Sequence, residues 1–118
     1  MANLDKFTRS NEDIYREVQL LSGSTPFDLD DFSDIDITVK HKFSHIEIAS
    51  FNLVAGTITK EDAANGILSF IIDRSDTEGE QTGIYQYEVT TQEADVEYED
   101  NLRYRDFIGD CFILIPEL

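Results

Sequence analysis

Apolar and polar residues alternate with a period of two in several short segments, and this pattern restricts the fold more than any other feature. The alternation is clearest where Ile35, Ile37 and Val39 are separated by polar side chains, and it recurs in residues 14–21 and 84–89. A period of two is that of a strand with one face in a core and the other in water. We therefore predict a chiefly β protein.

Two apolar runs complete the set of predicted strands. Residues 67–72 are almost continuously apolar, which predicts a strand central to the core. Residues 111–115 predict the last strand, after a turn or bulge at residues 109–110. Counting all segments, we predict an all-β, immunoglobulin-like β-sandwich of about seven or eight antiparallel strands.

The irregular segments have distinct expected roles. Residues 60–66 have the composition of one short helical turn closed by a glycine, and they are the only helix that we predict. Residues 73–83 are polar and predict a surface loop. Phe27 and Leu29 are apolar residues in an acidic segment, so we expect them to anchor that segment onto the core, with Phe32 as a further side chain that fills it.

The chain has the length of one domain. Its 118 residues suffice for a single core, and we divide them into an N-terminal arm, residues 1–10, and a sandwich domain, residues 11–118. The N-terminus does not resemble a signal peptide, and the longest apolar runs are too short to cross a bilayer. The single cysteine, Cys111, has no partner for an internal disulfide and is expected to be a small buried side chain.

The charge balance restricts the partners. The chain has 25 acidic and 9 basic residues and a formal net charge of -16. A field of this sign repels nucleic acid, so we predict no nucleic-acid partner. A basic protein partner, divalent cations, or repulsion that keeps free subunits soluble would each account for the acidity, as would a solvated acidic surface without further function.

Four short motifs occur in a characteristic order. Residues 25–29 read Thr-Pro-Phe-Asp-Leu, residues 55–58 read Ala-Gly-Thr-Ile, residues 64–70 lead into the apolar run, and residues 83–89 read Gly-Ile-Tyr-Gln-Tyr-Glu-Val. With the strand before them they span about two-thirds of the chain. In this order the chain resembles the immunoglobulin-like modules of tailed-bacteriophage virion proteins, which include the amino-terminal domains of baseplate upper proteins.

The resemblance implies a function. It implies a non-enzymatic structural protein of the virion, made in the host cytoplasm, that acts as an adaptor or decoration module. The implied partners are other phage structural proteins of the tail, baseplate, connector or capsid, and copies of the chain itself within a symmetric particle. Neither a nucleic-acid nor a membrane partner is expected.

A partner site is expected at a sheet edge or in the N-terminal arm. Leu4 and Phe7 are apolar residues in an arm that lacks core periodicity, and we expect them to dock on a neighbouring subunit. Motifs typical of hydrolases, phosphate loops or zinc proteases do not occur in the chain. We therefore predict no catalytic residue, no cofactor and no bound metal.

Two groups of residues leave a metal as an alternative. The acidic segment places the carboxylates of five aspartates close together in sequence, and hard cations such as calcium prefer such ligands. The alternative is a solvated loop whose side chains cap their own turns. The five are Asp28, Asp30, Asp31, Asp34 and Asp36. His41 and His45 would share a helical face, but the flanking residues predict a strand and a bend.

The tyrosines also allow two interpretations. Either Tyr85 or Tyr87 is expected to bond back to a nearby loop backbone, as in a tyrosine corner. In a rival function, a carbohydrate-binding module for host surfaces, the strand and hairpin tyrosines and the loop of residues 73–82 would form the sugar site. A third function, an acidic inhibitor of a basic host protein, would use the charge alone.

Overall fold

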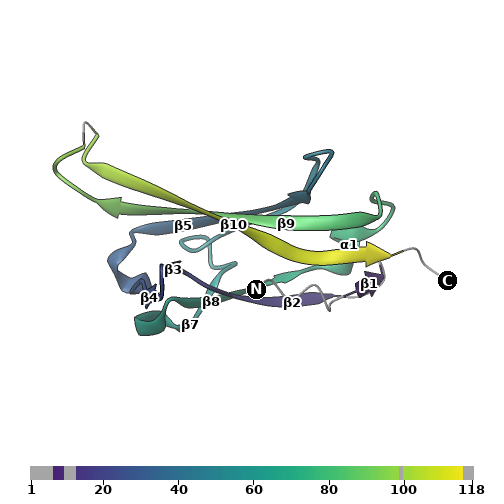
Figure 1. The fold of residues 1–118 in the computed structure, drawn as a ribbon, viewed down its shortest axis with the longest axis horizontal. Coiled ribbons are helices and arrows are strands. Elements are labelled where there is room, and N and C mark those ends of the chain that lie inside the picture. The colour runs from purple at the N-terminus through teal and green to yellow at the C-terminus, as the bar shows by residue number, and fades with distance from the viewer. Residues whose placement is uncertain (1–6, 10–12, 99, 116–118) are drawn as a thin grey trace.

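The protein folds into two main β-sheets packed face to face (Figure 1). The computed structural model describes residues 7–9, 13–98 and 100–115. Five strands form one sheet in the order β1-β10-β9-β5-β6, and three form the other in the order β2-β8-β7. Their bounds are β1 Phe7–Arg9, β2 Ile14–Gln19, β5 Asp34–His41, β6 Glu47–Asn52, β7 Thr59–Asp62, β8 Ile67–Ile72, β9 Gly83–Ala94 and β10 Leu102–Ile115.

The core lies between the inner faces of the two sheets. The alternating residues Ile35, Ile37 and Val39 are fully buried, which confirms the predicted strand. Leu68, Phe70 and Ile72 lie opposite them in β8, and the Tyr85 ring stacks on that of Phe112 with centroids 5.0 Å apart. Leu29 and Phe32 are also buried, as expected for anchors of the acidic segment. Because period-two burial closes around one interior, the chain forms a chiefly antiparallel, all-β sandwich.

The helical prediction is wrong in number. The part of the chain that the structure describes contains three short helices: η1 Leu29–Asp31, η2 Ala63–Asn65 and α1 Arg74–Thr77. Only η2, closed by Gly66 at φ 71°, lies in the predicted segment of residues 60–66. The first residues of that segment, 60–62, belong to β7 instead. The other two helices start at aspartate caps, because Asp28 and Asp73 accept hydrogen bonds from backbone amides two residues ahead.

Two features of the sheets differ from a purely antiparallel sandwich of about seven or eight strands. The short β1 pairs in parallel with the end of β10, with Phe7 opposite Ile113. A two-stranded ribbon, β3 Leu21–Ser22 and β4 Thr25–Pro26, brings the strands in the described residues to ten. None of the described helices is long and apolar enough to span a bilayer.

Candidate functional site

The β9–β10 hairpin is the longest pairing in the fold and carries the candidate site. The two strands pair antiparallel from Leu102 opposite Ala94 to Leu114 opposite Gly83. The tip of the hairpin extends past the three-stranded sheet (Figure 1). Gly109 has no side chain where a Cβ would collide with the hydroxyl of Tyr87, so the two strands approach closely there.

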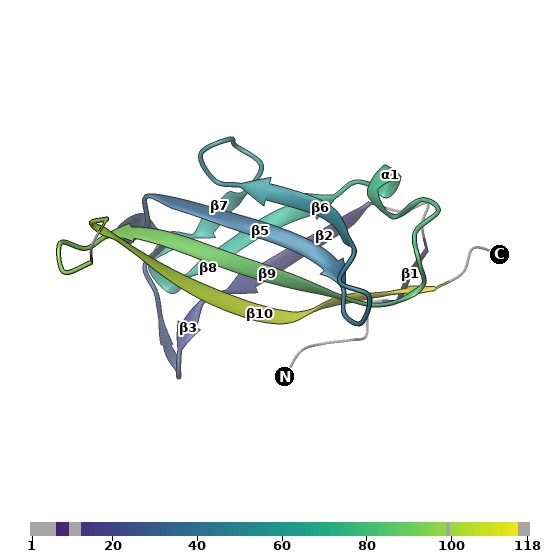
Figure 2. The same cartoon turned by 90° about the horizontal axis from the view of Figure 1, so that it is seen from above.

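The outer edge of β10 is open along most of its length. Among the described residues, β1 pairs with this edge only at residues 113–115. The carbonyl oxygen of Cys111, at a bulge in β10, accepts a hydrogen bond from Arg16 Nε at 2.8 Å. No described strand pairs with the edge of residues 102–110, which we call the open edge. Figure 2 shows β10 along one side of the sandwich. An edge of this kind presents backbone donors and acceptors that another strand can complete.

Side chains on the outer face of the open edge are partly apolar. Tyr104 is 54% exposed and Ile108 is 62% exposed. The intervening Asp106 accepts a hydrogen bond from the Thr90 hydroxyl at 2.8 Å. A partner strand at this edge would therefore meet two apolar side chains and one carboxylate that is already bound.

The inner face of the open edge is held by its own chain. Arg105 Nε lies 3.0 Å from Glu93 Oε1, and its guanidinium stacks over the Phe27 ring at 5.0 Å. Phe107 packs edge-on against the same Phe27 ring with centroids 5.6 Å apart. These contacts fix the strand in an extended conformation, so a partner need not order it on binding.

Phe7, one of the two predicted arm residues, lies at the other end of β10. Phe7 belongs to β1, whose backbone pairs with the same chain's β10, and Leu4 lies outside the described residues. The arm of residues 1–10 is thus a strand of the sheet over Phe7–Arg9. Removing the arm would lengthen the open edge by uncovering residues 113–115.

The five aspartates of the acidic segment are divided between η1 and β5. Asp28 caps η1, Asp30 forms an ion pair with Lys60 at 2.7 Å, and Asp31 is exposed within η1. Asp34 and Asp36 lie on β5, where the side-chain amide of Asn52 donates to both at 3.0 and 2.7 Å. Within the described residues, no group of three histidine, cysteine or acidic side chains is placed to hold a metal ion.

Asp34 has the most hydrogen bonds of the five. Its burial by itself raises the pKa of the carboxyl group, but bonds from Asn52 and from the backbone amides of Ile35 and Val54 outweigh that effect. The pKa of Asp34 is therefore below its usual value. These bonds tie the start of β5 to the loop after β6, which is a structural role.

The histidines do not form a pair. His41 is buried, its Nδ1 accepts from the backbone amides of Phe43 and Ser44 at 3.2 and 3.1 Å, and its Nε2 lies 3.1 Å from the Thr82 carbonyl oxygen. This pattern assigns the proton to Nε2 and leaves no lone pair for a metal. His45 is exposed in the following turn at φ 62°.

The tyrosines are likewise divided between core and surface. The Tyr85 hydroxyl donates to the Gln81 carbonyl oxygen at 2.6 Å, so the expected bond back to a loop backbone is confirmed. Tyr98 and Tyr104 are partly exposed near the tip of the β9–β10 hairpin, whereas the loop of residues 73–82 lies at its opposite end (Figure 1). The structure therefore separates Tyr98 and Tyr104 from that loop, and Tyr85, which contacts the loop, is buried.

The lone cysteine is inaccessible. Cys111 is buried at the bulge of β10, and this burial raises the pKa of its thiol to about 12, although the Arg16 guanidinium acts in the opposite direction. A thiol that stays protonated at neutral pH is a poor nucleophile. The expectation of a small buried side chain is confirmed.

The geometry of the edge was only partly visible in the sequence. An open edge was expected, but nothing in the alternation distinguishes an edge strand from a central one, so its place on β10 was missed. The local signal is the turn or bulge predicted at residues 109–110, next to the observed bulge at Cys111, because bulges are frequent at sheet edges. No protein-family model matches the chain, and no curated protein matches it.

Proposed function

We propose that this chain is a non-enzymatic assembly module that joins a neighbouring protein subunit through the open edge of β10. The observation that carries the proposal is the length of that edge: nine residues, 102–110, have no strand partner among the described residues. Their extended conformation is fixed by contacts on the inner face. Strand addition at such an edge supplies affinity through main-chain hydrogen bonds, and alternate side chains supply specificity.

The proposed fold is an immunoglobulin-like sandwich. The orders β2-β8-β7 and β10-β9-β5-β6 correspond to the orders B-E-D and G-F-C-C′ of immunoglobulin domains. The Tyr85 hydroxyl, bonded to the backbone four residues upstream, supports the same assignment, because immunoglobulin domains place a tyrosine corner at the start of strand F. In this fold the free edge of strand G is available for a partner.

The proposed setting is a bacteriophage virion. The support is the order of the motifs between residues 25 and 89, which resembles that of phage immunoglobulin-like modules. In this setting the partner is another virion protein or a second copy of the chain in a symmetric particle. A non-enzymatic role is supported by the buried Cys111 thiol and by the His41 ring, whose two nitrogens are both bonded to the backbone.

The experiment compares two lysine variants in assembly. Ile108→Lys places a charge on the open edge, and Val54→Lys places the same charge at an exposed apolar residue in the loop after β6. Lysine on an edge strand discourages strand pairing. We expect Ile108→Lys to fold normally but to be depleted from purified particles, and Val54→Lys to be incorporated like the wild type, as measured by quantitative mass spectrometry of the particles.

Two results would count against the proposal. Equal incorporation of both variants would exclude the open edge as the joining surface. Absence of the wild-type chain from particles would exclude the virion setting, and self-association of the purified chain, measured by sedimentation velocity, would then show whether the edge joins copies of the chain instead.

A further inference from the structure

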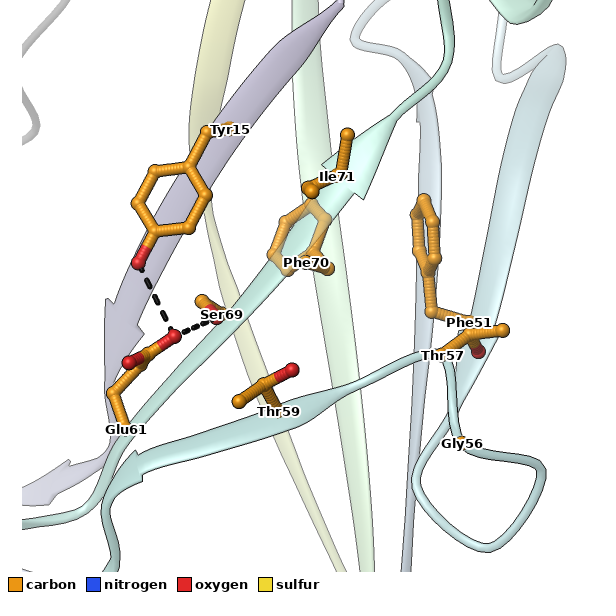
Figure 3. Close-up of a pocket in the computed structure, with 9 residues that line it drawn as sticks. All are labelled: Tyr15, Phe51, Gly56, Thr57, Thr59, Glu61, Ser69, Phe70 and Ile71. Carbon is orange, nitrogen blue, oxygen red and sulfur yellow. Dashed lines mark hydrogen bonds between the residues drawn. The ribbon is translucent and has the colours of Figure 1, made fainter.

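A cavity of about 400 Å³ lies beside β6, on the flank of the sandwich away from the open edge. It is bounded by β6, the loop before β7, and residues of β2, β7 and β8. Tyr15, Glu61 and Ser69 gather at one end, and Phe51 and Thr57 lie at the other (Figure 3). Because β10 and β6 are at opposite ends of the four-strand order β10-β9-β5-β6 within the five-stranded sheet, a ligand here would not compete with a strand at the open edge.

The polar end of the cavity is built around Glu61. The register of β7 against β8 shifts between Lys60 and Asp62, so Glu61 is the extra residue of a bulge. A bulge redirects a side chain, and here it brings the Glu61 carboxylate to the Ser69 hydroxyl, which donates to Oε2 at 2.6 Å. Ser69 is only 3% exposed, so this contact holds the carboxylate in one place.

A second carboxylate adjoins the first. The Tyr15 hydroxyl lies 2.9 Å from Glu17 Oε2 and 3.3 Å from Glu61 Oε2. Its single proton satisfies only one of the two carboxylates at a time. No lysine or arginine among the described residues forms an ion pair with either glutamate. Among the described residues, the polar end therefore has two negative charges without an ion-paired cation.

The rest of the lining is apolar. The Phe51 and Phe70 rings pack with centroids 5.0 Å apart, and the side chains of Tyr15 and Ile71 are half exposed. An aliphatic stem that ends in a cation complements such a lining, because the stem packs on the rings while the cation meets the carboxylate. A calcium ion would leave the apolar part empty, and a neutral sugar would leave the two charges uncompensated.

We propose that this cavity binds the side chain of a lysine or arginine from a partner protein. The net charge of -16 would attract a basic partner to the surface, and Glu61 would give the contact its position. Since the cavity uses no residue of β10, the inference goes beyond the proposed function, and the two are tested with different variants.

The test is an NMR titration of the whole chain with N-acetyl-lysinamide and N-acetyl-argininamide. We expect saturable shifts confined to the amides of residues 57–61 and 69–71, weakening as salt is raised. The uncharged analogue N-acetyl-norleucinamide should produce none of them. Glu61→Gln should weaken the binding at least about fivefold, because it removes the charge from the ion pair.

Two further variants control for charge and for folding. Glu97→Gln removes an equal charge at an exposed residue near the tip of the β9–β10 hairpin and should leave the binding unchanged. Thr59→Lys keeps Glu61 and Ser69 in place but supplies an internal cation beside them, and it should abolish the binding. The proposal is wrong if Glu61→Gln and Glu97→Gln bind the lysine and arginine amides equally. It is also wrong if methyl glucoside produces the local shifts and the lysine and arginine amides do not.

Discussion

The Tyr85→Phe substitution tests whether one hydroxyl holds the loop before β9. The Tyr85 side chain is 1% exposed, and its ring stacks on Phe112 and meets His41 edge-on. Phenylalanine keeps all of these contacts and loses only the 2.6 Å bond to the Gln81 carbonyl oxygen. Gln81 is exposed, so water can replace part of that bond. We expect a loss of about 1–2 kcal/mol in the free energy of unfolding.

The measurement is urea and thermal denaturation at neutral pH. A loss of this size lowers the Tm of a domain of this length by about 4–8 °C. Tyr15→Phe is the matched control, since its hydroxyl bonds Glu17 at the surface, and it should change stability by less than about 0.5 kcal/mol. Hydrogen exchange in residues 77–82 should accelerate only in Tyr85→Phe. Equal stability of the two variants would refute the assigned role.

Two predictions follow from shifted pKa values. Burial raises the pKa of the Cys111 thiol to about 12, so a disulfide reagent at pH 8 should modify the native chain only as fast as it opens, and modify the urea-unfolded chain at once; rapid native reaction would contradict the burial. The pKa of the Asp34 carboxyl group is lower in the folded state than in the unfolded state. The stability that its hydrogen bonds contribute is therefore fully present above the unfolded pKa, near 3.8, and is lost as pH falls through the lower folded pKa. Asp34→Asn should therefore be less stable than the wild type at pH 7, with the difference shrinking below about pH 4 in urea titrations; a difference independent of pH would contradict it.

The strands that face the core were predictable from alternation. Ile35, Ile37 and Val39 occupy the buried face because a period of two leaves only one register that hides all three. The apolar run of residues 67–72 was harder to interpret. Ile71 is 58% exposed on the outer side of the sheet although the run predicted burial, since an unbroken apolar run carries no information on which face is covered.

The short helices and the polar contacts were less predictable. Residues 73–83 have a loop composition, but the Asp73 side chain caps a helical turn at Ser75, and a single cap is too local to be recognised in a polar segment. Residues 60–62 have helical composition, yet β7 pairs with β8 there, because tertiary pairing overrides a weak propensity. The cavity combines a bulge on β7 with residues from β2 and β6, and no sequence spacing encodes that meeting.

The outer face of the five-stranded sheet is a poorer candidate for partner binding than the two flanks. On the five-stranded sheet, Lys40 pairs with Glu88 at 3.3 Å and Lys42 with Asp110 at 3.7 Å, so much of the charge on that face is already compensated within the chain. Within the described residues, the open edge of β10 leaves backbone groups without a strand partner, and the Glu61 cavity leaves carboxylates without an ion pair. Because these two features lie on opposite flanks, one chain has the geometry to connect a strand from one partner to a basic side chain from another. If so, Ile108→Lys and Glu61→Gln should impair the two contacts independently. Their effects on the free energy of assembly should then add.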